Sequence, residues 1–229
     1  MMVNSNKKSG KQIDAAIFDL DGTLLDTLED LKNAVNAALV QYHMPERSLE
    51  EVRRFVGNGI RTLMLRAVPE GEDNPDFEEA FAFFQSYYKA HCKEHTGPYE
   101  GILGVLKVLS EKGIKMAIVS NKFDPAVKEL NREHFGEYMQ TAIGEMPGVE
   151  RKPAPDMVHM ALELLGVEKE HAVYVGDSDV DIQTAKNAGV ECICVTWGFR
   201  DARFLKECGA KTLIDKPWEL LELIDGKKE

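Results

Sequence analysis

The sequence predicts an α/β fold, a doubly wound and mostly parallel sheet with an inserted α-helical cap. Short apolar runs alternate with helical patterns along most of the chain, which is typical of such sheets. The alternation is broken once, between Thr27 and about His95, where every pattern is helical. With 229 residues, 44% of them hydrophobic, the chain can hold one α/β domain and a small insertion.

Six apolar runs predict the strands of the sheet, and they lie at 13–19, 115–120, near 139–143, 172–176, 191–196 and 211–214. The helical patterns between most of them lie at 101–112, 124–135, 154–165 and 179–188. Strands separated by helices favour parallel pairing, with helices on both faces of the sheet. Ligands of such sheets bind at the carboxyl ends of the strands, near the point where the strand order switches. We therefore expect the polar residues that follow these strands to share one crevice.

The helical segment carries an aromatic stripe on its last helix. Its helical patterns lie at 28–43, near 49–54, at 59–67 and at 76–94. Aromatic residues at helical spacing predict the packing face of a helical bundle, and here they are Phe77, Phe81, Phe84, Tyr87, Tyr88 and His91. His91 and His95 lie one turn apart, but no third ligand is evident nearby, which favours a surface face over a metal site.

The segment boundaries predict three regions. Residues 28–95 form the cap, and residues 12–27 and 96–229 form the α/β core. Thr27 and the Thr96–Gly97 pair are the expected hinges, since Gly97 and Pro98 end the helical segment. Residues 1–11 are polar with no apolar run, so we expect a flexible tail rather than a signal peptide or membrane anchor.

Two carboxylates end the first predicted strand. Asp19 and Asp21 are two residues apart, so their side chains leave the strand on the same side. Like charges about 4 Å apart repel by roughly 4 kcal/mol at an effective dielectric of about 20, and such a pair favours a bound cation or a shared proton. Gly22 and Thr23 follow, and an Asp-Gly turn after a strand is also ordinary turn chemistry. This segment alone leaves both interpretations open.

Three further segments agree with the chemical interpretation. Ser120 and Asn121 end the run at 115–119, Lys152 precedes a helical pattern, and Asp177 ends the run at 172–176, with Asp181 four residues on. Together with Asp19-x-Asp21-Gly22-Thr23, these four motifs, in this order, resemble the haloacid dehalogenase superfamily of phosphohydrolases. Within it, the chain is most similar to the phosphoglycolate phosphatase group. The resemblance implies a Rossmann-like core with a C1-type helical cap.

The resemblance also implies a role for each core residue. Asp19 is expected to be the nucleophile that forms an aspartyl-phosphate, and Asp21 the general acid and base. Lys152 is expected to offset the charge of the nucleophile and of the transition state. A Mg²⁺ ion is expected on the side chains of Asp19 and Asp177 and on the backbone carbonyl of Asp21, with Asp181 orienting a water or Lys152.

The phosphoryl group is expected to contact Gly22, Thr23, Ser120 and Asn121. Ser120 offers a hydroxyl and Asn121 a backbone N–H to its oxygens. For Lys122, substrate contact and a solvated side chain remain open.

A glycine loop in the cap is the expected source of specificity. The amides of residues 57–59 open a helix and form a candidate anion-binding nest, or else a plain turn. The loop resembles the matching cap loop of phosphoglycolate phosphatases, so Asn58 and Arg61 are candidate substrate-binding residues, with Arg61 placed for a substrate carboxylate.

Together these features predict a cytoplasmic Mg²⁺-dependent phosphatase of small phosphorylated metabolites, with 2-phosphoglycolate the first candidate. A pyrophosphatase or 5′-nucleotidase of the same superfamily is the alternative, followed by a phosphomutase and a non-catalytic binding domain. The net charge of −11 and the absence of a Lys/Arg stripe argue against nucleic acid as a partner. No membrane partner is expected, and the protein is expected to be a monomer or weak homodimer. Cys192 and Cys194 share one strand face, but reduced buried thiols are favoured over a metal or redox pair.

Overall fold

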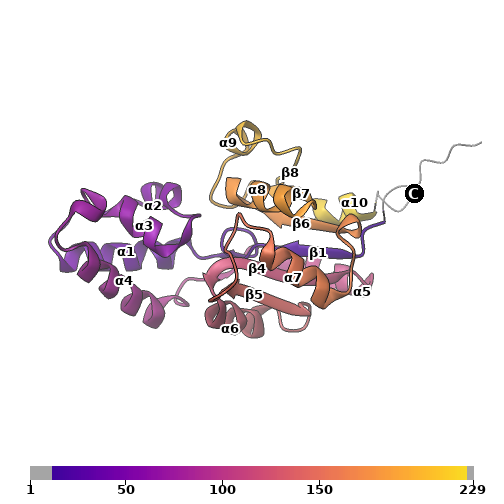
Figure 1. The fold of residues 1–229 in the computed structure, drawn as a ribbon, viewed down its shortest axis with the longest axis horizontal. Helices are drawn as coiled ribbons and strands as arrows, with labels where there is room; N and C mark the ends of the chain where they lie inside the picture. Colours follow the sequence, from indigo (N-terminus) through magenta and orange to yellow (C-terminus); the bar gives the residue numbers. More distant parts are fainter. Residues whose placement is uncertain (1–11, 226–229) are drawn as a thin grey trace, which may run out of the picture.

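The computed structural model describes residues 12–225, and the expected tail at 1–11 lies outside the described residues. The chain forms an α/β part and a helical part that lies beyond one end of the sheet (Figure 1). Within residues 12–225, no helix is long and apolar enough to cross a membrane.

The six-stranded sheet has the order β5-β4-β1-β6-β7-β8, and all neighbouring strands are parallel. In chain order the strands are β1 (Ala15–Phe18), β4 (Lys115–Phe123), β5 (Thr141–Glu145), β6 (Ala172–Gly176), β7 (Glu191–Val195) and β8 (Thr212–Ile214). Because β4 and β6 flank β1, the strand order switches at the carboxyl end of β1. The predicted mostly parallel α/β fold is confirmed.

Helices cover both faces of this sheet, because side chains of each strand alternate between two apolar clusters. Ala16 and Phe18 pack with α5 (Ile102–Glu111), α6 (Asp124–His134) and α10 (Glu219–Asp225). Ala15 and Ile17 pack with α7 (Asp156–Leu165) and α8 (Asp179–Ala188). The short helices α9 (Ala202–Glu207) and α10 are not predicted from the sequence pattern.

The helical part contains α1 (Leu28–Gln41), α2 (Leu49–Phe55), α3 (Gly59–Ala67) and α4 (Phe77–His91) around a third apolar cluster. The aromatic stripe of α4 contributes to this cluster, as its spacing predicts: Phe77, Phe84 and Tyr88 are buried. Single 3₁₀ turns occur at Gly71–Asp73 and Lys169–His171.

Two chain crossings join the helical part to the sheet. The short strands β2 (Leu25–Asp26) and β3 (Gly97–Pro98) pair antiparallel and hold the crossings side by side. The buried carboxylate of Asp30 accepts hydrogen bonds from the backbone N–H groups of His95 and Thr96, at 3.0 and 2.9 Å, and from the Thr96 hydroxyl at 2.7 Å. The start of α1 is therefore fixed to the segment by which the chain returns to the core.

Candidate active site

One pocket gathers the four motifs at the carboxyl edge of the sheet. Its core-side lining comes from the ends of β1, β4 and β6, from the loop before α7 and from the loop after β7, and comprises Asp19, Asp21, Ser120, Asn121, Lys122, Lys152, Asp177, Ser178 and Phe199. The pocket lies at the switch point of the strand order, where parallel sheets bind ligands. The helical part covers it, so this segment is a cap.

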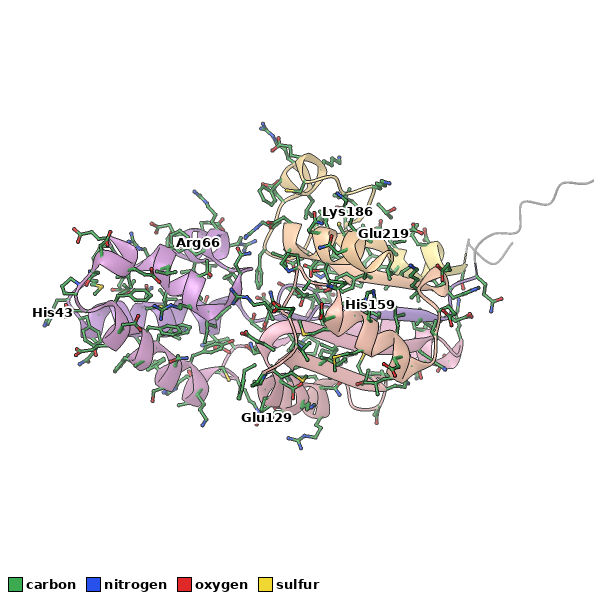
Figure 2. All side chains as sticks on the ribbon, viewed as in Figure 1. His43, Arg66, Glu129, His159, Lys186 and Glu219 are labelled. Carbon is green, nitrogen blue, oxygen red and sulfur yellow. The ribbon has the colours of Figure 1, made fainter. Side chains whose placement is uncertain are left out.

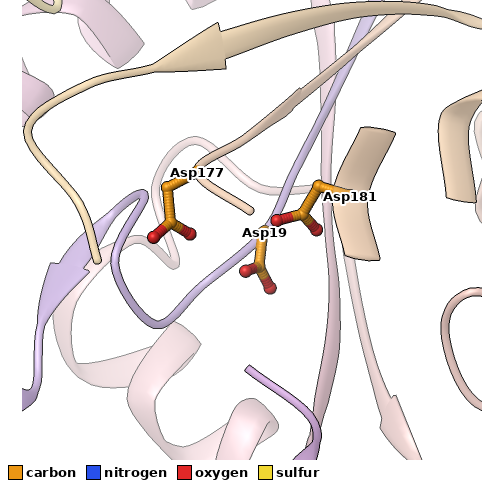
Figure 3. A group of neighbouring side chains, drawn as sticks. All are labelled: Asp19, Asp177 and Asp181. Carbon is orange, nitrogen blue, oxygen red and sulfur yellow. The ribbon is translucent and has the colours of Figure 1, made fainter. Parts of the chain in front are cut away.

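Three carboxyl groups form a buried cluster in this pocket. Oxygen atoms of Asp19, Asp177 and Asp181 lie within 4.8 Å of one another (Figure 3). Burial, together with the neighbouring carboxylates, raises the pKa of Asp19 well above its usual range and that of Asp177 to about 7. The cluster is therefore costly to ionise fully without a compensating cation.

Lys152 supplies one positive charge to this cluster. Its Nζ atom lies 2.7 Å from Oδ1 of Asp19 and 2.9 Å from Oδ1 of Asp181. Burial would lower the pKa of this ammonium, but the two carboxylates raise it above its usual value. The side chain of Asn121 exchanges two hydrogen bonds with the backbone of Lys152, at 2.9 and 3.1 Å. Asn121 therefore holds the Lys152 loop against the end of β4.

Asp181 is saturated with hydrogen bonds. Its Oδ1 atom accepts from Lys152 and from the Tyr174 hydroxyl at 3.0 Å. Its Oδ2 atom accepts from the backbone N–H and hydroxyl of Ser178, which caps α8. A Cβ atom on Gly176 would lie 2.4 Å from Asp181, so the strand end must be glycine for this carboxylate to fit. Asp181 is thus placed to hold Lys152.

Asp177 is held by the loop that follows β7. Its Oδ2 atom accepts from the backbone N–H of Phe199 at 2.7 Å, and its Oδ1 atom accepts from the Thr23 hydroxyl at 3.3 Å. A Cβ atom on Gly198 would lie 2.3 Å from the carbonyl oxygen of Gly22. The structure therefore places Gly22 and Thr23 behind Asp177, and neither lines the pocket.

Lys122 joins the core to the cap. Its Nζ atom lies 3.0 Å from Oδ1 of Asp21 and 2.9 Å from the hydroxyl oxygen of Tyr88 on α4. The Lys122 side chain is only 10% exposed, so the solvated alternative is wrong. Burial would lower the pKa of Lys122, but Asp21 and Tyr88 raise it above its usual value.

The glycine loop of the cap reaches the pocket through its backbone. Gly57, Gly59 and Ile60 line the pocket, whereas the side chains of Asn58 and Arg61 do not. Asn58 accepts a hydrogen bond from Arg66.

Arg61 is held outside the pocket by its own part of the cap. Its guanidinium pairs with Glu72 and Glu78, at 3.3 and 2.5 Å, and stacks over Phe77 and Phe81. The expected position of Arg61 beside a substrate carboxylate is therefore not found, because two acidic residues of the cap hold it elsewhere.

Two residues of this site are not predicted from the sequence. Tyr88 belongs to the aromatic stripe of α4, whose spacing predicts only a packing face. Arg200, after β7, donates to the carbonyl oxygens of Arg53 and Val56 at 2.9 and 2.6 Å, which are orphan carbonyls at the end of α2. The sequence feature that comes closest to predicting this loop is the pair Trp197-Gly198 before Phe199.

The acidic cluster is the one close group of three or more metal-ligating side chains within residues 12–225. Three carboxylates and one ammonium leave two uncompensated negative charges in a buried space, which matches a divalent cation. An oxygen-only donor set suits a hard cation better than zinc. The four cysteines are free, and Cys192 and Cys194 have their Sγ atoms 3.7 Å apart outside this cluster. His91 pairs with Glu94 on the surface, as a surface face predicts.

The parallel sheet, the helical cap and this carboxylate-rich pocket define a hydrolase with a Rossmann-like α/β core and a helical cap. The chain belongs to the haloacid dehalogenase-like hydrolase family, whose model matches residues 16–195. The resemblance inferred from the four motifs is therefore confirmed.

Relatives of this chain extend the comparison over nearly its whole length. Phosphoglycolate phosphatase 1 of Pseudomonas aeruginosa is 35% identical over 219 residues, which cover 93% of this chain and 80% of the relative. The phosphoglycolate phosphatase of Aquifex aeolicus is 32% identical and covers 92% of this chain and 96% of its own length.

Solved structures share the fold at similar coverage. A crystal structure from Lactobacillus delbrueckii subsp. bulgaricus, provisionally assigned as a phosphoglycolate phosphatase, has a TM-score of 0.89 and 38% identity and covers 93% of this chain and 98% of its own. CbbY from Rhodobacter sphaeroides, in complex with phosphate, has a TM-score of 0.74 and 28% identity and covers 93% of this chain and 100% of its own.

Proposed function

We propose that this protein is a Mg²⁺-dependent phosphatase of small phosphorylated metabolites, with 2-phosphoglycolate the first candidate substrate. The observation that carries this proposal is the contact of Lys152 with Asp19 at 2.7 Å inside a pocket that also contains Asp21. A nucleophilic carboxylate, a neighbouring cation and a second carboxylate for proton transfer are the groups that a two-step phosphoryl transfer needs.

In the first step, an Asp19 oxygen attacks phosphorus and the bond from phosphorus to the ester oxygen breaks. Asp21 gives its proton to the leaving oxygen, which departs as an alcohol. In the second step, Asp21 takes a proton from water as that water attacks phosphorus, and Asp19 is released as a carboxylate with inorganic phosphate. Both residues line the pocket, so one phosphoryl group can meet both.

Positive charge and hydrogen-bond donors surround the transferred group. The Ser120 hydroxyl and the backbone N–H of Asn121 lie in the last part of β4, in the pocket lining, and donate to the phosphoryl oxygens. Lys152 is held in place by Asp181 and by the side chain of Asn121. Charge that develops on the phosphoryl oxygens therefore meets groups that are already oriented.

Asp19, Asp177 and the backbone carbonyl of Asp21 would hold Mg²⁺. When bound, the ion supplies charge that neutralises the carboxylates and the phosphoryl oxygens. Thr23 and the Phe199 N–H hold Asp177 in the orientation that this role requires.

The pocket favours a small leaving group. The cavity has a volume of about 80 Å³, and the cap side of its wall is apolar except for Tyr88, with Leu31, Val56, Ile60 and Leu63. Such a lining favours a leaving group with a short carbon skeleton. The relatives that carry the name phosphoglycolate phosphatase favour the same small substrate.

Turnover of a substrate panel tests the proposal. Purified protein is assayed with 2-phosphoglycolate, pyrophosphate, nucleoside monophosphates and sugar phosphates, with Mg²⁺ and with EDTA. We expect the highest kcat/KM for 2-phosphoglycolate and no turnover in EDTA. A preference for pyrophosphate or a nucleotide would contradict the substrate, and metal-independent turnover would contradict the cofactor.

A further inference from the structure

A second lysine, Lys122, lies in the pocket beside Asp21, the proposed acid/base residue. Lys122 and Lys152 are the cations among the described residues that line the pocket. Lys152 is committed to Asp19 and Asp181. A ligand with a second negative group would therefore meet Lys122.

Lys122 has one weakly engaged hydrogen-bond donor. A lysine ammonium has three N–H donors. Its Nζ atom donates to the two oxygens of Asp21, at 3.0 and 3.3 Å, and to the hydroxyl oxygen of Tyr88 at 2.9 Å. The contact at 3.3 Å is the longest of the three, so its N–H is the one that an acceptor on a molecule in the pocket would take.

The hydroxyl of Tyr88, next to Lys122, has a free hydrogen-bond donor. Its hydroxyl oxygen accepts from Lys122, and no acceptor for its own O–H occurs among the described residues. Burial, offset in part by Lys122, raises the pKa of Tyr88 to about 12, so the phenol remains protonated at neutral pH. Two donors, one from β4 and one from α4 of the cap, thus meet at one point of the pocket lining.

We infer that Lys122 and Tyr88 form a carboxylate subsite, so that the substrate is the phosphate ester of a small 2-hydroxy acid. Two neighbouring donors match the two oxygens of one carboxylate. This inference rests on the proposed function and assigns the recognition of the leaving group to residues other than Arg61.

The position of Asp21 sets where the carboxylate must lie. To protonate the leaving group, Asp21 must contact the ester oxygen, and Lys122 lies 3.0 Å from Asp21. The cation is then within reach of a carboxylate on the carbon next to the ester oxygen. The surrounding wall includes Leu31, Leu63 and Phe199, which accept the carbon skeleton and offer no charge to a further polar group.

A pair of matched esters tests the subsite. 2-Phosphoglycolate and ethyl phosphate have similar leaving groups and differ in the carboxylate. We expect the wild-type protein to prefer 2-phosphoglycolate in kcat/KM by about 100-fold. Tyr88→Phe and Lys122→Met should each reduce this preference about tenfold or more, since each removes a hydrogen bond to a charged group.

Two matched controls separate the subsite from general damage. Tyr87→Phe changes the neighbouring tyrosine of α4, which stacks on Phe83 and His91 outside the pocket. Lys128→Met removes an exposed lysine that pairs with Asp124. Both controls should keep the wild-type preference. Equal losses on the two esters in Tyr88→Phe and Lys122→Met would overturn the subsite and leave Lys122 as a positioning residue for Asp21.

A binding measurement separates this inference from the proposed catalysis. In an Asp19→Asn background, calorimetry should show tighter binding of 2-phosphoglycolate than of ethyl phosphate, and adding Tyr88→Phe should reduce that difference. Equal binding of both esters would overturn the subsite whatever the turnover. If the difference is present but wild-type protein hydrolyses neither ester, the proposed function fails and the subsite stands.

Discussion

The Nζ atom of Lys152 lies 2.7 Å from Oδ1 of Asp19, in a space where both side chains are almost fully buried. Asp181 fixes the other side of Lys152 at 2.9 Å. The buried lysine therefore lies between two carboxylates and neutralises only one of them. This excess of negative charge explains both the expected metal dependence and the expected pH dependence of the protein.

Lys152→Met should remove turnover and also destabilise the protein. The variant leaves Asp19 and Asp181 buried without their cation, and breaking a buried ion pair costs about 3–5 kcal/mol. Urea unfolding and kcat/KM measure the two effects. Lys169→Met is the matched control, because Lys169 is exposed and lies outside the pocket. A stable variant with full turnover would show that this charge has no role.

Mg²⁺ should stabilise the protein through the acidic cluster. Binding to the folded state alone contributes RT ln(1 + [L]/Kd), about 2.7 kcal/mol at a hundredfold excess over Kd. We expect Tm to rise across millimolar Mg²⁺ and this rise to be largely lost in Asp177→Asn. An unchanged Tm in the wild-type protein, or an equal rise in the variant, would argue against Asp177 as a ligand.

Metal-free protein should lose stability as the pH rises. Burial and the neighbouring Asp181 raise the pKa of Asp177 to about 7, above its unfolded value of about 3.9. Between these values the folded state binds more protons than the unfolded state, so the free energy of unfolding decreases with increasing pH. Urea unfolding in EDTA at pH 5 and pH 8 should show this loss, and Asp177→Asn should reduce it. An equal dependence of the free energy of unfolding on pH in Asp177→Asn would contradict this role of Asp177.

Arg200 should control how the cap covers the site. Its two hydrogen bonds to carbonyl oxygens at the end of α2 hold the segment that leads into the glycine loop. Arg200→Met should lower kcat/KM for the substrate about tenfold, since a hydrogen bond to a charged group is lost. It should also increase hydrogen exchange in residues 55–59. Arg203→Met is the control, because Arg203 is 88% exposed and pairs with Glu207. Equal behaviour of the two variants would remove Arg200 from this role.

Exposed salt bridges also connect the cap to α6 of the core. Lys93, just after α4, pairs with Glu129 and Glu133 of α6 at 2.6 and 2.8 Å. Figure 2 labels Glu129 on this helix. These groups are largely exposed, and exposed pairs contribute little to stability. The buried contacts of Tyr88 and Arg200 are therefore the more specific connections between cap and core.

The sequence alone is sufficient to predict the parallel sheet and the place of the motif residues in it. Alternating runs predict the parallel sheet, and each motif residue follows a predicted strand, so topology alone brings Asp19, Ser120 and Asp177 together. Boundaries are less accurate. The run at 115–120 extends to Phe123, where β4 pairs again with Glu145 of β5 after an irregularity in the register. Such pairing depends on a partner strand that is distant in sequence.

The cap contacts could not be predicted for a similar reason. Tyr88 reads as packing because its hydroxyl partner, Lys122, is 34 residues away. Arg200 bonds to backbone carbonyl groups, which leave no trace in the sequence. Arg61 has the chemistry to bind a carboxylate, but Glu72 and Glu78 occupy it. Residue type therefore identifies candidates, and the surrounding charges decide which of them reach the pocket.

Trapping of the phosphorylated protein tests the central claim most directly. Asp21→Asn should slow release of phosphate, because an amide cannot activate water, and the covalent form should accumulate with Mg²⁺ and an aryl phosphate, whose leaving group departs without a proton from Asp21. Acid quenching followed by peptide mass spectrometry should find a phosphoryl group on Asp19, and none when Asp19→Asn is added. Phosphate on another residue, or wild-type turnover with no modified Asp19 at any time point, would contradict the proposed mechanism.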